Sequence, residues 1–560
     1  MNEQSDPTPH NRSTALHPTV AEGLILGLIS LAVVAIYGQI GQHRPLAFDD
    51  ALYLTENGWV LQGLTWRGAL WAFTNVDAAN WHPLTWLSHM ADQSLFGSVI
   101  GAHMIENLFW HAANSMLVYR LLRALNLTRT VACVLALIFA AHPLNVESVA
   151  WLSQRKTQLS TFFLLVTTLV YLGGRIQQRT SLQVLLVTAF SLSLMAKATG
   201  VALPLILLGY EAMRFRQSTA ENPRGAGPAL RPWLASTLRR LAPLVAVALA
   251  VALATFFAQR SQGAVASVES IPLLHRIPNA ATAITTYLRT FVWPAELCLF
   301  YPMPKSPDWA EATTGLLLLA AGGLWIAVFA RRAPLMILGG IWFLLALLPV
   351  VGLVQVGSQS HADRYMYLPM IGLLIMIGAF TETVRLPDGR PGRAALTGVL
   401  TAFALGMGVH AFAYTQLWRD PETAYRRSIA VGGPSYAILL NLAAAYEQQN
   451  LFKTAEQTNA IAARLWPDRP GALGNHASSL ALLGRYAEAE TLFRRALALD
   501  PENFKLHYLL GLVLLESNNP ECEVFFQNAR RLLPPETDWR PGNLEIRNIL
   551  VGRAPLPQHR

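Results

Sequence analysis

Long apolar runs separated by short polar segments dominate the first 415 residues of the chain. A helix that crosses the hydrocarbon core of a bilayer needs about 20 mostly apolar residues, and sometimes as few as about 17. The sequence therefore predicts an all-α, polytopic bundle of about eleven transmembrane helices. The apolar runs lie near 20–40, 103–122, 130–142, 158–173, 181–197, 200–213, 241–258, 313–330, 334–352, 364–383 and 395–415.

After residue 416 the pattern changes to mixed helical segments with a 34-residue period. The period is that of the tetratricopeptide repeat (TPR), in which small residues let two helices approach and a proline ends the second helix. The unit 472–503 matches this pattern nearly throughout. A third unit carries Asn518 at the usual glycine and Glu523 at the usual alanine, as expected of a capping repeat. The recurring residues are Ala443, Ala477 and Gly511, and Pro467, Pro501 and Pro535.

Composition agrees with a membrane protein, because 53% of the residues are hydrophobic and only 14% are charged, against about 25% charged in soluble domains. The net charge of +9 would suit nucleic-acid binding, but the charges form short clusters between apolar runs, which is typical of membrane topology signals. Cys133, Cys298 and Cys522 are too far apart for a disulfide framework or a CxxC metal site. The first apolar run lacks a clear cleavage site, so we expect it to be retained.

Basic residues are shared unevenly between alternate loops. The loops that include Arg12 and the 214–240 segment carry 17, and the opposite set carries 9 over about twice the length. The positive-inside bias predicts a cytoplasmic N-terminus. With an odd number of spans, the repeats would then lie outside the cytoplasm.

Charged residues gather in the loops on that predicted outer side. An adjacent carboxylate pair opens the first loop, the second loop ends in a tandem cation pair, and a lone lysine and an Asp-Arg-Tyr triplet follow at helix ends. Interfacial snorkelling would explain each cation alone, but together they suggest one cleft that holds an anion. These residues are Asp49, Asp50, Glu147, Arg155, Lys156, Lys197, Asp363, Arg364 and Tyr365.

Four polar residues of the second apolar run, His103, Asn107, His111 and Asn114, lie three or four positions apart and share one helical face. Polar side chains within a membrane normally face the bundle interior. The spacing would allow a zinc site, yet no carboxylate or cysteine completes one. We therefore favour hydrogen bonds between helices.

Several motifs occur in an order that resembles a known family. They are FDDALYL (48–54), WHPLTWLSHM (81–90), FGSVIGAHMIENLFWHAANSMLVY (96–119), HPLNVESVAWLSQRK (142–156), the lysine of MAKATGVALPL, HADRYMYLP (361–369) and QLWRDPETAYRRSI (416–429). Nearly the whole chain is similar to the transmembrane-and-tetratricopeptide-repeat O-mannosyltransferases and their bacterial relatives. It departs from them at His82 and Ala198, where relatives often have Arg and Glu.

The resemblance implies a C-type membrane glycosyltransferase (GT-C) that takes a sugar from a polyprenyl-phosphate carrier. Such a transfer needs a general base at the acceptor hydroxyl and cations at the leaving phosphate. By resemblance, Asp49 is the expected base and Asp50 orients the acceptor or a water. Arg155, Lys156, Lys197 and Arg364 are the expected phosphate ligands, with His82, His103, Glu147, Asp363 and Tyr365 as further residues of the cleft.

We expect no organic cofactor, and we leave the participation of a divalent metal open. The expected partners are the lipid-linked donor, membrane lipid and a protein or glycan acceptor held by the repeats, with no nucleic acid. The expected location is a bacterial inner membrane, with the repeats in the periplasm. The expected domains are a tail (1–19), a catalytic bundle (20–415), a linker (416–434), the TPR domain (435–536) and a second tail (537–560).

Two other functions are compatible with this architecture. A non-catalytic scaffold would anchor the repeats for a partner and would not respond to a change at Asp49. A transporter or flippase is less consistent with the charges, because transport sites lie near the bilayer midplane.

Overall fold

The computed structural model describes residues 18–46, 48–76, 80–174, 179–221, 229–261, 272–329, 333–355, 357–384 and 392–532. These residues are helical or form connections, apart from one short antiparallel pair of strands, β1 (Tyr301–Pro302) and β2 (Gln359–His361). The C-terminal tail and nearly all of the N-terminal tail lie outside the described residues. Pro535 of the 34-residue period also lies outside them. So do seven of the arginines counted for the orientation: Arg12, Arg175, Arg224, Arg331, Arg332, Arg385 and Arg390.

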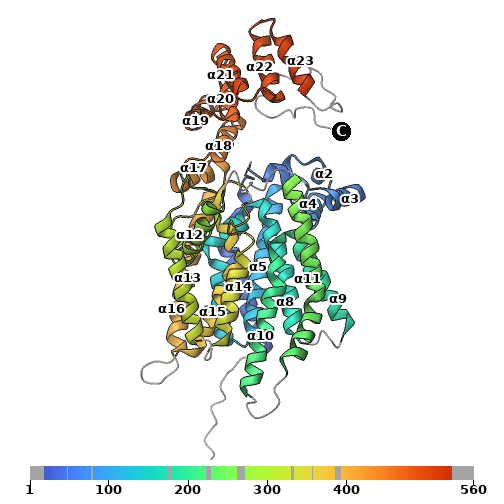
Figure 1. The fold of residues 1–560 in the computed structure, drawn as a ribbon, viewed down its shortest axis with the longest axis vertical. Coiled ribbons are helices and arrows are strands. Elements are labelled where there is room, and N and C mark those ends of the chain that lie inside the picture. The colour runs from blue at the N-terminus through green and yellow to red at the C-terminus, as the bar shows by residue number, and fades with distance from the viewer. Residues whose placement is uncertain are drawn as a thin grey trace, which may run out of the picture.

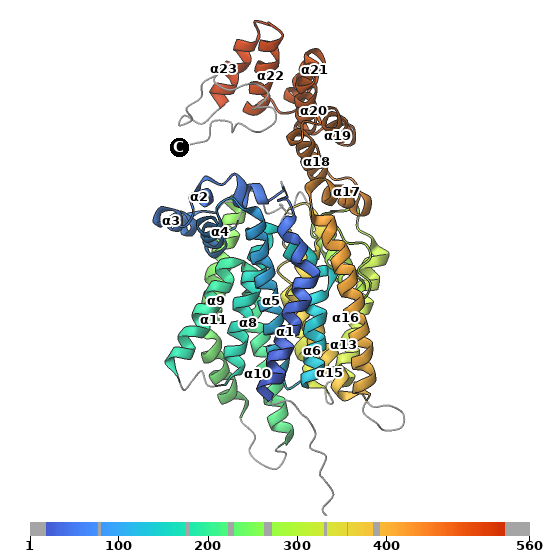
Figure 2. The same cartoon turned by 180° about the vertical axis from the view of Figure 1, so that it is seen from behind.

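Long helices form a bundle, and a stack of short helices stands on one end of it (Figures 1 and 2). The bundle and its loops contain α1 (Pro18–Tyr37), α2 (Gly58–Leu61), α3 (Trp66–Thr74), α4 (Pro83–Phe96), α5 (Ile100–Ala124), α6 (Arg129–Ala141), α7 (Val146–Ala150), α8 (Arg155–Leu172), α9 (Thr180–Ala196), α10 (Leu203–Glu221), α11 (Leu230–Ser261), α12 (Leu273–Val292), α13 (Trp309–Phe329), α14 (Pro334–Leu347), α15 (Pro369–Thr383) and α16 (Arg393–Thr415). The stack contains α17 (Pro421–Gly432), α18 (Tyr436–Gln448), α19 (Phe452–Leu465), α20 (Pro470–Leu482), α21 (Tyr486–Leu499), α22 (Phe504–Glu516) and α23 (Cys522–Leu532). Short helical turns join them: η1 (Gly38–Gln42), η2 (Ala51–Thr55), η4 (Pro143–Asn145), η5 (Leu152–Gln154), η7 (Ala198–Ala202), η8 (Asp363–Met366) and η9 (Gln416–Trp418).

Each of the eleven predicted apolar runs falls on a helix, but fewer helices qualify as membrane spans. Within the described ranges, five are long and apolar enough to cross a bilayer, or six if the bent pair of α6 and the following 143–150 segment counts as one span. The α9, α14 and α15 helices are apolar but shorter. Because α5 carries buried polar residues along its length, its composition is less apolar than that of a simple lipid-facing helix.

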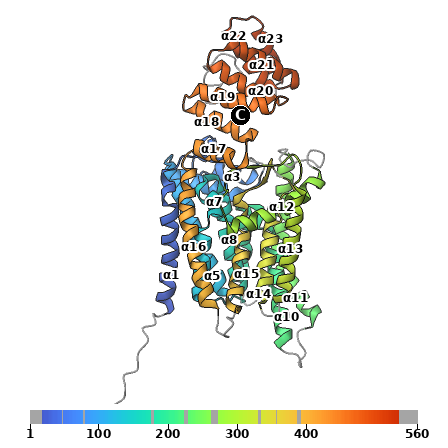
Figure 3. The same ribbon diagram turned by 90° about the vertical axis from the view of Figure 1, so that its left-hand side faces the viewer.

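Small residues allow the closest helix contacts in the bundle. A Cβ atom at Gly339 of α14 would lie 2.5 Å from the carbonyl oxygen of Gly372 in α15, and the reverse distance is also 2.5 Å. A Cβ at Gly315 of α13 would lie 2.4 Å from the carbonyl oxygen of Ala281 in α12. Backbones therefore meet directly at these positions, as in small-residue packing of membrane helices. Figure 3 shows α1 and α16 together at one edge of the bundle and α13 towards the other.

The polar face of α5 points into the bundle. Asn107 donates to the carbonyl oxygens of Val149 and Trp151, both at 3.2 Å, and Asn114 donates to that of Gln158 at 2.9 Å. The ring nitrogens of His111 lie 2.8 Å from the hydroxyl of Tyr367 and 3.1 Å from the carbonyl oxygen of Ala140. These contacts are the helix-to-helix hydrogen bonds that the spacing predicted.

The C-terminal stack consists of paired helices, as the 34-residue period predicted. The turns inside the three pairs place Asn450, Gly484 and Asn518 at φ values of 61°, 75° and 51°. Asparagine and glycine are the residues that adopt this left-handed conformation most readily. Asn518 therefore meets the same backbone requirement as the glycine of the middle repeat.

The first repeat is continuous with the bundle. Buried side chains of α18 and α19, including Ile438, Leu442, Tyr446 and Ala455, belong to the same apolar core as the membrane helices. A separate core begins at Ala463 and extends through α23. The first helix pair is thus part of the base on which the remaining repeats stand.

Candidate active site

A cavity of about 430 Å³ lies at the end of the bundle that carries the repeats. Five of the residues singled out in the sequence line it: Asp49, Lys156, Lys197, Arg364 and Tyr365. They come from the first loop, the start of α8, the end of α9 and η8, so widely separated segments supply them. We call this space the cationic cavity, because three of these five side chains are cations.

Asp49 and Lys156 form an ion pair inside the cationic cavity. The Lys156 Nζ atom lies 3.6 Å from Asp49 Oδ2, and it donates to the hydroxyl of Tyr53 at 3.0 Å. The same ammonium group lies 4.2 Å from the centre of the Tyr53 ring. The Asp49 side chain remains 34% exposed, so its carboxylate can be reached from the cavity.

Lys197 follows the last residue of α9 and is held by a short polar chain. Its Nζ atom donates to Thr157 Oγ1 at 2.9 Å, and that hydroxyl donates to Gln154 Oε1 at 3.0 Å. Thr157 lies in the first turn of α8, next to Lys156. The start of α8 therefore positions both ammonium groups, one directly and one through a hydroxyl.

Arg364 is oriented by Glu147, a fully buried carboxylate of α7. The guanidinium Nη1 atom pairs with one carboxylate oxygen, and the backbone N–H of Arg364 donates to the other at 2.6 Å. The guanidinium carbon also lies 5.3 Å and 5.0 Å from the ring centres of Trp151 and Tyr365. These contacts fix the side chain at the cavity wall with 14% of it exposed. Since the backbone N–H makes one of the two contacts, the guanidinium itself uses a single nitrogen on Glu147.

Asp50 and Arg155 do not line the cationic cavity, contrary to the roles expected for them. Asp50 is fully buried and accepts hydrogen bonds from the backbone N–H groups of Leu46 and Ser153, at 2.8 Å and 2.9 Å. Burial raises the pKa of Asp50 to about 7, and these two donors oppose that shift. The carboxylate therefore joins the first loop to η5, just before α8.

Arg155 points into a different part of the bundle. Its guanidinium pairs with Asp92 and, at 2.8 Å, with Glu106, while its Nε atom donates to Asn107 at 2.8 Å. The side chain is fully buried among these partners. Successive residues of a helix point about 100° apart, so Lys156 can face the cavity while Arg155 fastens α8 to α4 and α5.

The other predicted residues of the cleft act as supports or lie elsewhere. His82 stacks on Tyr53 with ring centres 5.4 Å apart, and His103 lies 2.8 Å from the carbonyl oxygen of Gly97 and 3.4 Å from Asp92. Asp363 accepts a hydrogen bond from Tyr301 at 2.9 Å, and burial raises its pKa well above the usual range. Of the non-cationic candidates, Tyr365 and Asp49 line the cavity.

The amide and hydroxyl groups of the cavity were not among the residues predicted from the sequence. Gln154, Gln355, Gln359 and Ser360 line it beside the cations, and Gln359 donates to the Tyr365 hydroxyl at 3.0 Å. The signal was present, since each lies within eight residues of a predicted site residue in SQRK or in VQVGSQSHADR. Within the described ranges, no group of three or more His, Cys, Asp or Glu side chains is arranged to hold a metal ion.

Several long apolar helices and a C-terminal stack of helix pairs define an integral membrane protein with TPR repeats. The TPR repeat family matches residues 478–518. Over 428 residues the chain is 26% identical to the protein O-mannosyl-transferase Tmtc3 of Drosophila melanogaster. This aligned region covers 67% of this chain and 45% of that protein. It is 22% identical over 463 residues to the mouse protein O-mannosyl-transferase TMTC3, covering 76% of this chain and 48% of the relative.

The chain is therefore distantly homologous to these protein O-mannosyl-transferases, as its motifs predicted. A shorter match, 26% identical over 225 residues, joins it to Drosophila Tmtc2. The chain spans less than half the length of the relatives it matches.

Proposed function

We propose that the protein is a GT-C glycosyltransferase that moves a sugar from a polyprenyl-phosphate donor to a protein or glycan acceptor. The proposal includes eleven membrane spans, a cytoplasmic N-terminus, repeats on the opposite side, and a bacterial inner membrane as the site of action. The repeats would recruit the acceptor. Distant homology to proteins named as O-mannosyl-transferases supports membrane glycosyl transfer in general.

The single observation that carries the proposal is the charge pattern of the cationic cavity. Lys156, Lys197 and Arg364 face one space, and Asp49 is the carboxylate among the described residues that line it. Burial and the neighbouring Lys156 and Arg364 lower the pKa of Lys197 well below its usual range, and a bound anion would oppose this shift. Three basic groups around one space therefore favour an anionic occupant. A lipid phosphate with a sugar attached would bring its negative charge to the cations and its anomeric carbon towards the carboxylate.

In the proposed reaction, the Asp49 carboxylate takes the proton of the acceptor hydroxyl. The hydroxyl oxygen then forms a bond to the anomeric carbon, while the bond from that carbon to the phosphate oxygen breaks. The electron pair leaves with the polyprenyl phosphate, whose added charge is stabilised by the three cations. One base and one displacement imply inversion at the anomeric carbon.

Lys156 has two roles in this scheme, because its ammonium group also lies 3.6 Å from Asp49. A bound phosphate would compete for that ammonium group. Asp49 would then lose its ion-pair partner as the donor binds and would become free to accept a hydrogen bond from the acceptor.

The test is Asp49→Asn in full-length protein reconstituted in nanodiscs with lipid-linked sugars. General-base catalysis contributes about 10²–10⁴-fold, so transfer should fall by that factor while donor binding remains. Glu56→Gln is the matched control, since it makes the same change at an exposed position of the same loop. Near-full activity of Asp49→Asn would refute the assignment, and a scaffold protein would show no transfer in either variant.

Orientation has its own test. A reporter that is active only in the cytoplasm, fused after Arg560, should stay silent if the repeats lie on the opposite side. Strong reporter activity would overturn the orientation and, with it, the proposed access to an acceptor outside the cytoplasm.

A further inference from the structure

A second cavity, of about 520 Å³, lies between α12, the 293–304 segment, β2 and the end of α17. It shares Ser360 with the cationic cavity, so β2 borders both spaces. Its lining also includes Val431 and Gly432, the last residues of α17, which precedes the first repeat helix. We call it the α12 cavity. Nothing in the proposed transfer step uses its side chains.

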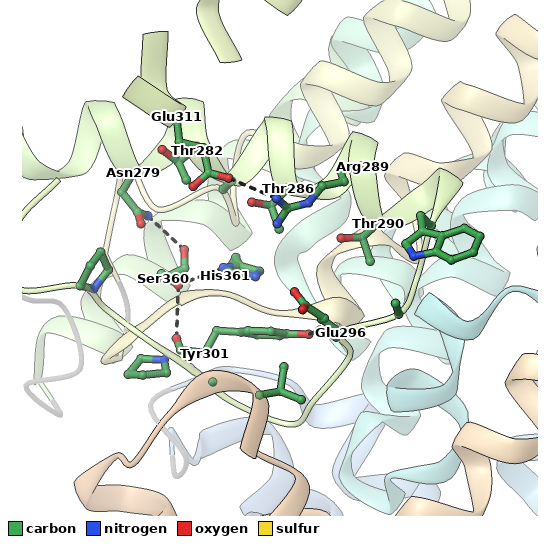
Figure 4. Close-up of a pocket in the computed structure, with 17 residues that line it drawn as sticks. Asn279, Thr282, Thr286, Arg289, Thr290, Glu296, Tyr301, Glu311, Ser360 and His361 are labelled. Atoms are coloured by element: carbon green, nitrogen blue, oxygen red, sulfur yellow. Dashed lines mark hydrogen bonds and ion pairs between the residues drawn. The ribbon is translucent and has the colours of Figure 1, made fainter. Parts of the chain in front are cut away.

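One face of α12 supplies a row of neutral polar groups to this space. Asn279, Thr282, Thr286 and Thr290 follow one another at intervals of three or four residues, which places them on one side of a helix. Figure 4 shows these side chains along one side of the opening, with Ser360 and His361 between them and Tyr301. The row offers three hydroxyls and an amide, groups that both donate and accept hydrogen bonds.

The opposite wall is aromatic. The rings of Tyr301 and His361 are stacked, with centres 4.1 Å apart and planes 21° from parallel. Tyr301 is held in place because its hydroxyl donates to Asp363 at 2.9 Å. Burial lowers the pKa of His361 to about 4, so this imidazole is neutral at physiological pH. The wall therefore presents uncharged ring surface beside the polar row.

Acidic side chains outnumber basic ones among the described residues of the α12 cavity, whereas basic side chains outnumber acidic ones among those of the cationic cavity. Of the described residues that line the α12 cavity, Glu296 and Glu311 are carboxylates and Arg289 is a cation. Arg289 pairs with Glu311 at 3.7 Å, which leaves Glu296 as excess negative charge. A phosphate or carboxylate ligand would be repelled here. The lining instead suits a neutral molecule that has many hydroxyl groups and an apolar face.

We propose that the α12 cavity binds a neutral saccharide unit of the acceptor. The volume lies within the range of about 300–1,000 Å³ usual for small-molecule sites. Sugar hydroxyls would bond the threonines, Asn279 and Glu296, while the C–H face of the ring packs on the Tyr301–His361 wall. The inference that the cavity binds a saccharide depends only on the residues that line it. The assignment of that saccharide to the acceptor rests on the proposed function and on the border shared with the cationic cavity.

The experiment measures saccharide binding by saturation-transfer NMR on full-length protein in nanodiscs, with no donor present. The probes are mannobiose, cellobiose and the acidic monosaccharide glucuronic acid. At least one neutral probe should bind, and glucuronic acid should not. Thr286→Leu should weaken neutral binding about tenfold or more, because it removes a hydrogen bond and fills the space. Thr314→Leu is the matched control, since Thr314 is exposed on α13 and outside the cavity.

A second variant keeps the proposal testable if Thr286→Leu folds poorly. Glu296→Gln changes an exposed side chain and removes the excess negative charge, so glucuronic acid should now bind. The proposal would be overturned if neither neutral probe binds, or if glucuronic acid binds the unaltered protein as well as the neutral probes do. It would also be overturned if Thr286→Leu and Thr314→Leu lose the same amount of binding. Saturation transfer to a serine- and threonine-containing peptide alone would overturn it as well.

Failure of the proposed function would look different. If the protein transfers no sugar from any lipid-linked donor but still binds the neutral probe through Thr286, the saccharide site stands and the transferase assignment falls. If Asp49→Asn abolishes transfer while no probe binds, the transferase assignment stands and the saccharide site falls.

Discussion

Replacing Arg364 with alanine should affect both stability and donor binding, and the two effects can be separated. Glu147 is fully buried and depends on Arg364 for its counter-ion. Without the guanidinium, the carboxylate keeps the backbone N–H of residue 364, which donates at 2.6 Å. Removing one partner of a buried ion pair costs about 3–5 kcal/mol, out of a total stability of about 5–15 kcal/mol. Arg364→Ala should therefore unfold at a clearly lower temperature.

The double variant Glu147→Gln with Arg364→Ala removes the uncompensated charge. The neutral amide can still accept the backbone hydrogen bond, so most of the lost stability should return. Donor binding should not return, because the phosphate still lacks its arginine. A charge-assisted hydrogen bond contributes about 1.5–3 kcal/mol, so the donor KM should stay roughly 10- to 100-fold above that of the unaltered protein.

Lys197→Met provides a matched comparison for donor binding. Lys197 donates to Thr157 at 2.9 Å and forms no ion pair within 4.0 Å among the described residues, so its loss leaves no carboxylate behind. It should raise the donor KM with little change in unfolding temperature. The assay combines thermal unfolding in nanodiscs with donor titrations of transfer rate. Recovery of both stability and donor KM in the Glu147→Gln, Arg364→Ala double variant would refute phosphate binding by Arg364 and leave it a structural role.

Three further predictions follow from the packing. Arg155→Ala should lower the unfolding temperature, because it removes the guanidinium partner of the buried Asp92 carboxylate. Lys156→Gln should mainly raise the donor KM. The reverse pattern would contradict their separate roles. Truncation after Leu465 keeps the repeat that shares the bundle core. Transfer to a small acceptor should therefore persist, while modification of the native acceptor should fall. An equal loss of activity on both acceptors would contradict recruitment by the repeats. Burial raises the pKa of Glu447 from 4.5 to about 7, so the folded chain keeps a proton that the unfolded chain releases, and the repeats should lose up to about 3 kcal/mol as pH rises through that window. Hydrogen exchange of α18 and α20 across pH 5–8 measures this loss, and Glu447→Gln should remove the pH dependence.

Periodicity along the chain was enough to locate the long apolar helices of the bundle and the helices of the C-terminal stack. Apolar runs longer than a few turns predicted the bundle, and a 34-residue spacing predicted the paired helices of the C-terminal stack. Both signals are local, because hydrophobic spacing directly reflects which side chains a helix must bury. The number of membrane spans depends on contacts between helices as well as on local sequence. Helices such as α5 satisfy their polar side chains through neighbours, so their composition alone understates how well they are buried.

The α12 cavity depends on a contact between distant segments, which helical spacing does not reveal. Residues 259–312 lie between the apolar runs 241–258 and 313–330 and so belong to the predicted outer loops, although Asn279, Thr282, Thr286 and Thr290 repeat with helical spacing. That spacing predicts one polar helix face but not what lies opposite it. Tyr301 and His361 reach the cavity through the pairing of β1 with β2, a contact between segments 60 residues apart at the paired positions Tyr301 and His361.

The charged motifs were enough to predict which segments line the cationic cavity, but only the packing of the folded chain selects the residue of each adjacent pair that faces it. Asp49, Lys156 and Arg364 line the cationic cavity, while their neighbours are turned into the protein to bond backbone, carboxylates or Tyr301. The neighbours are Asp50, Arg155 and Asp363. Two consecutive charges look equivalent in a sequence, but side chains one residue apart on a helix point about 100° apart. The packing of α4, α5 and α7 around the segment, rather than residue type, selects the one that remains open to a ligand.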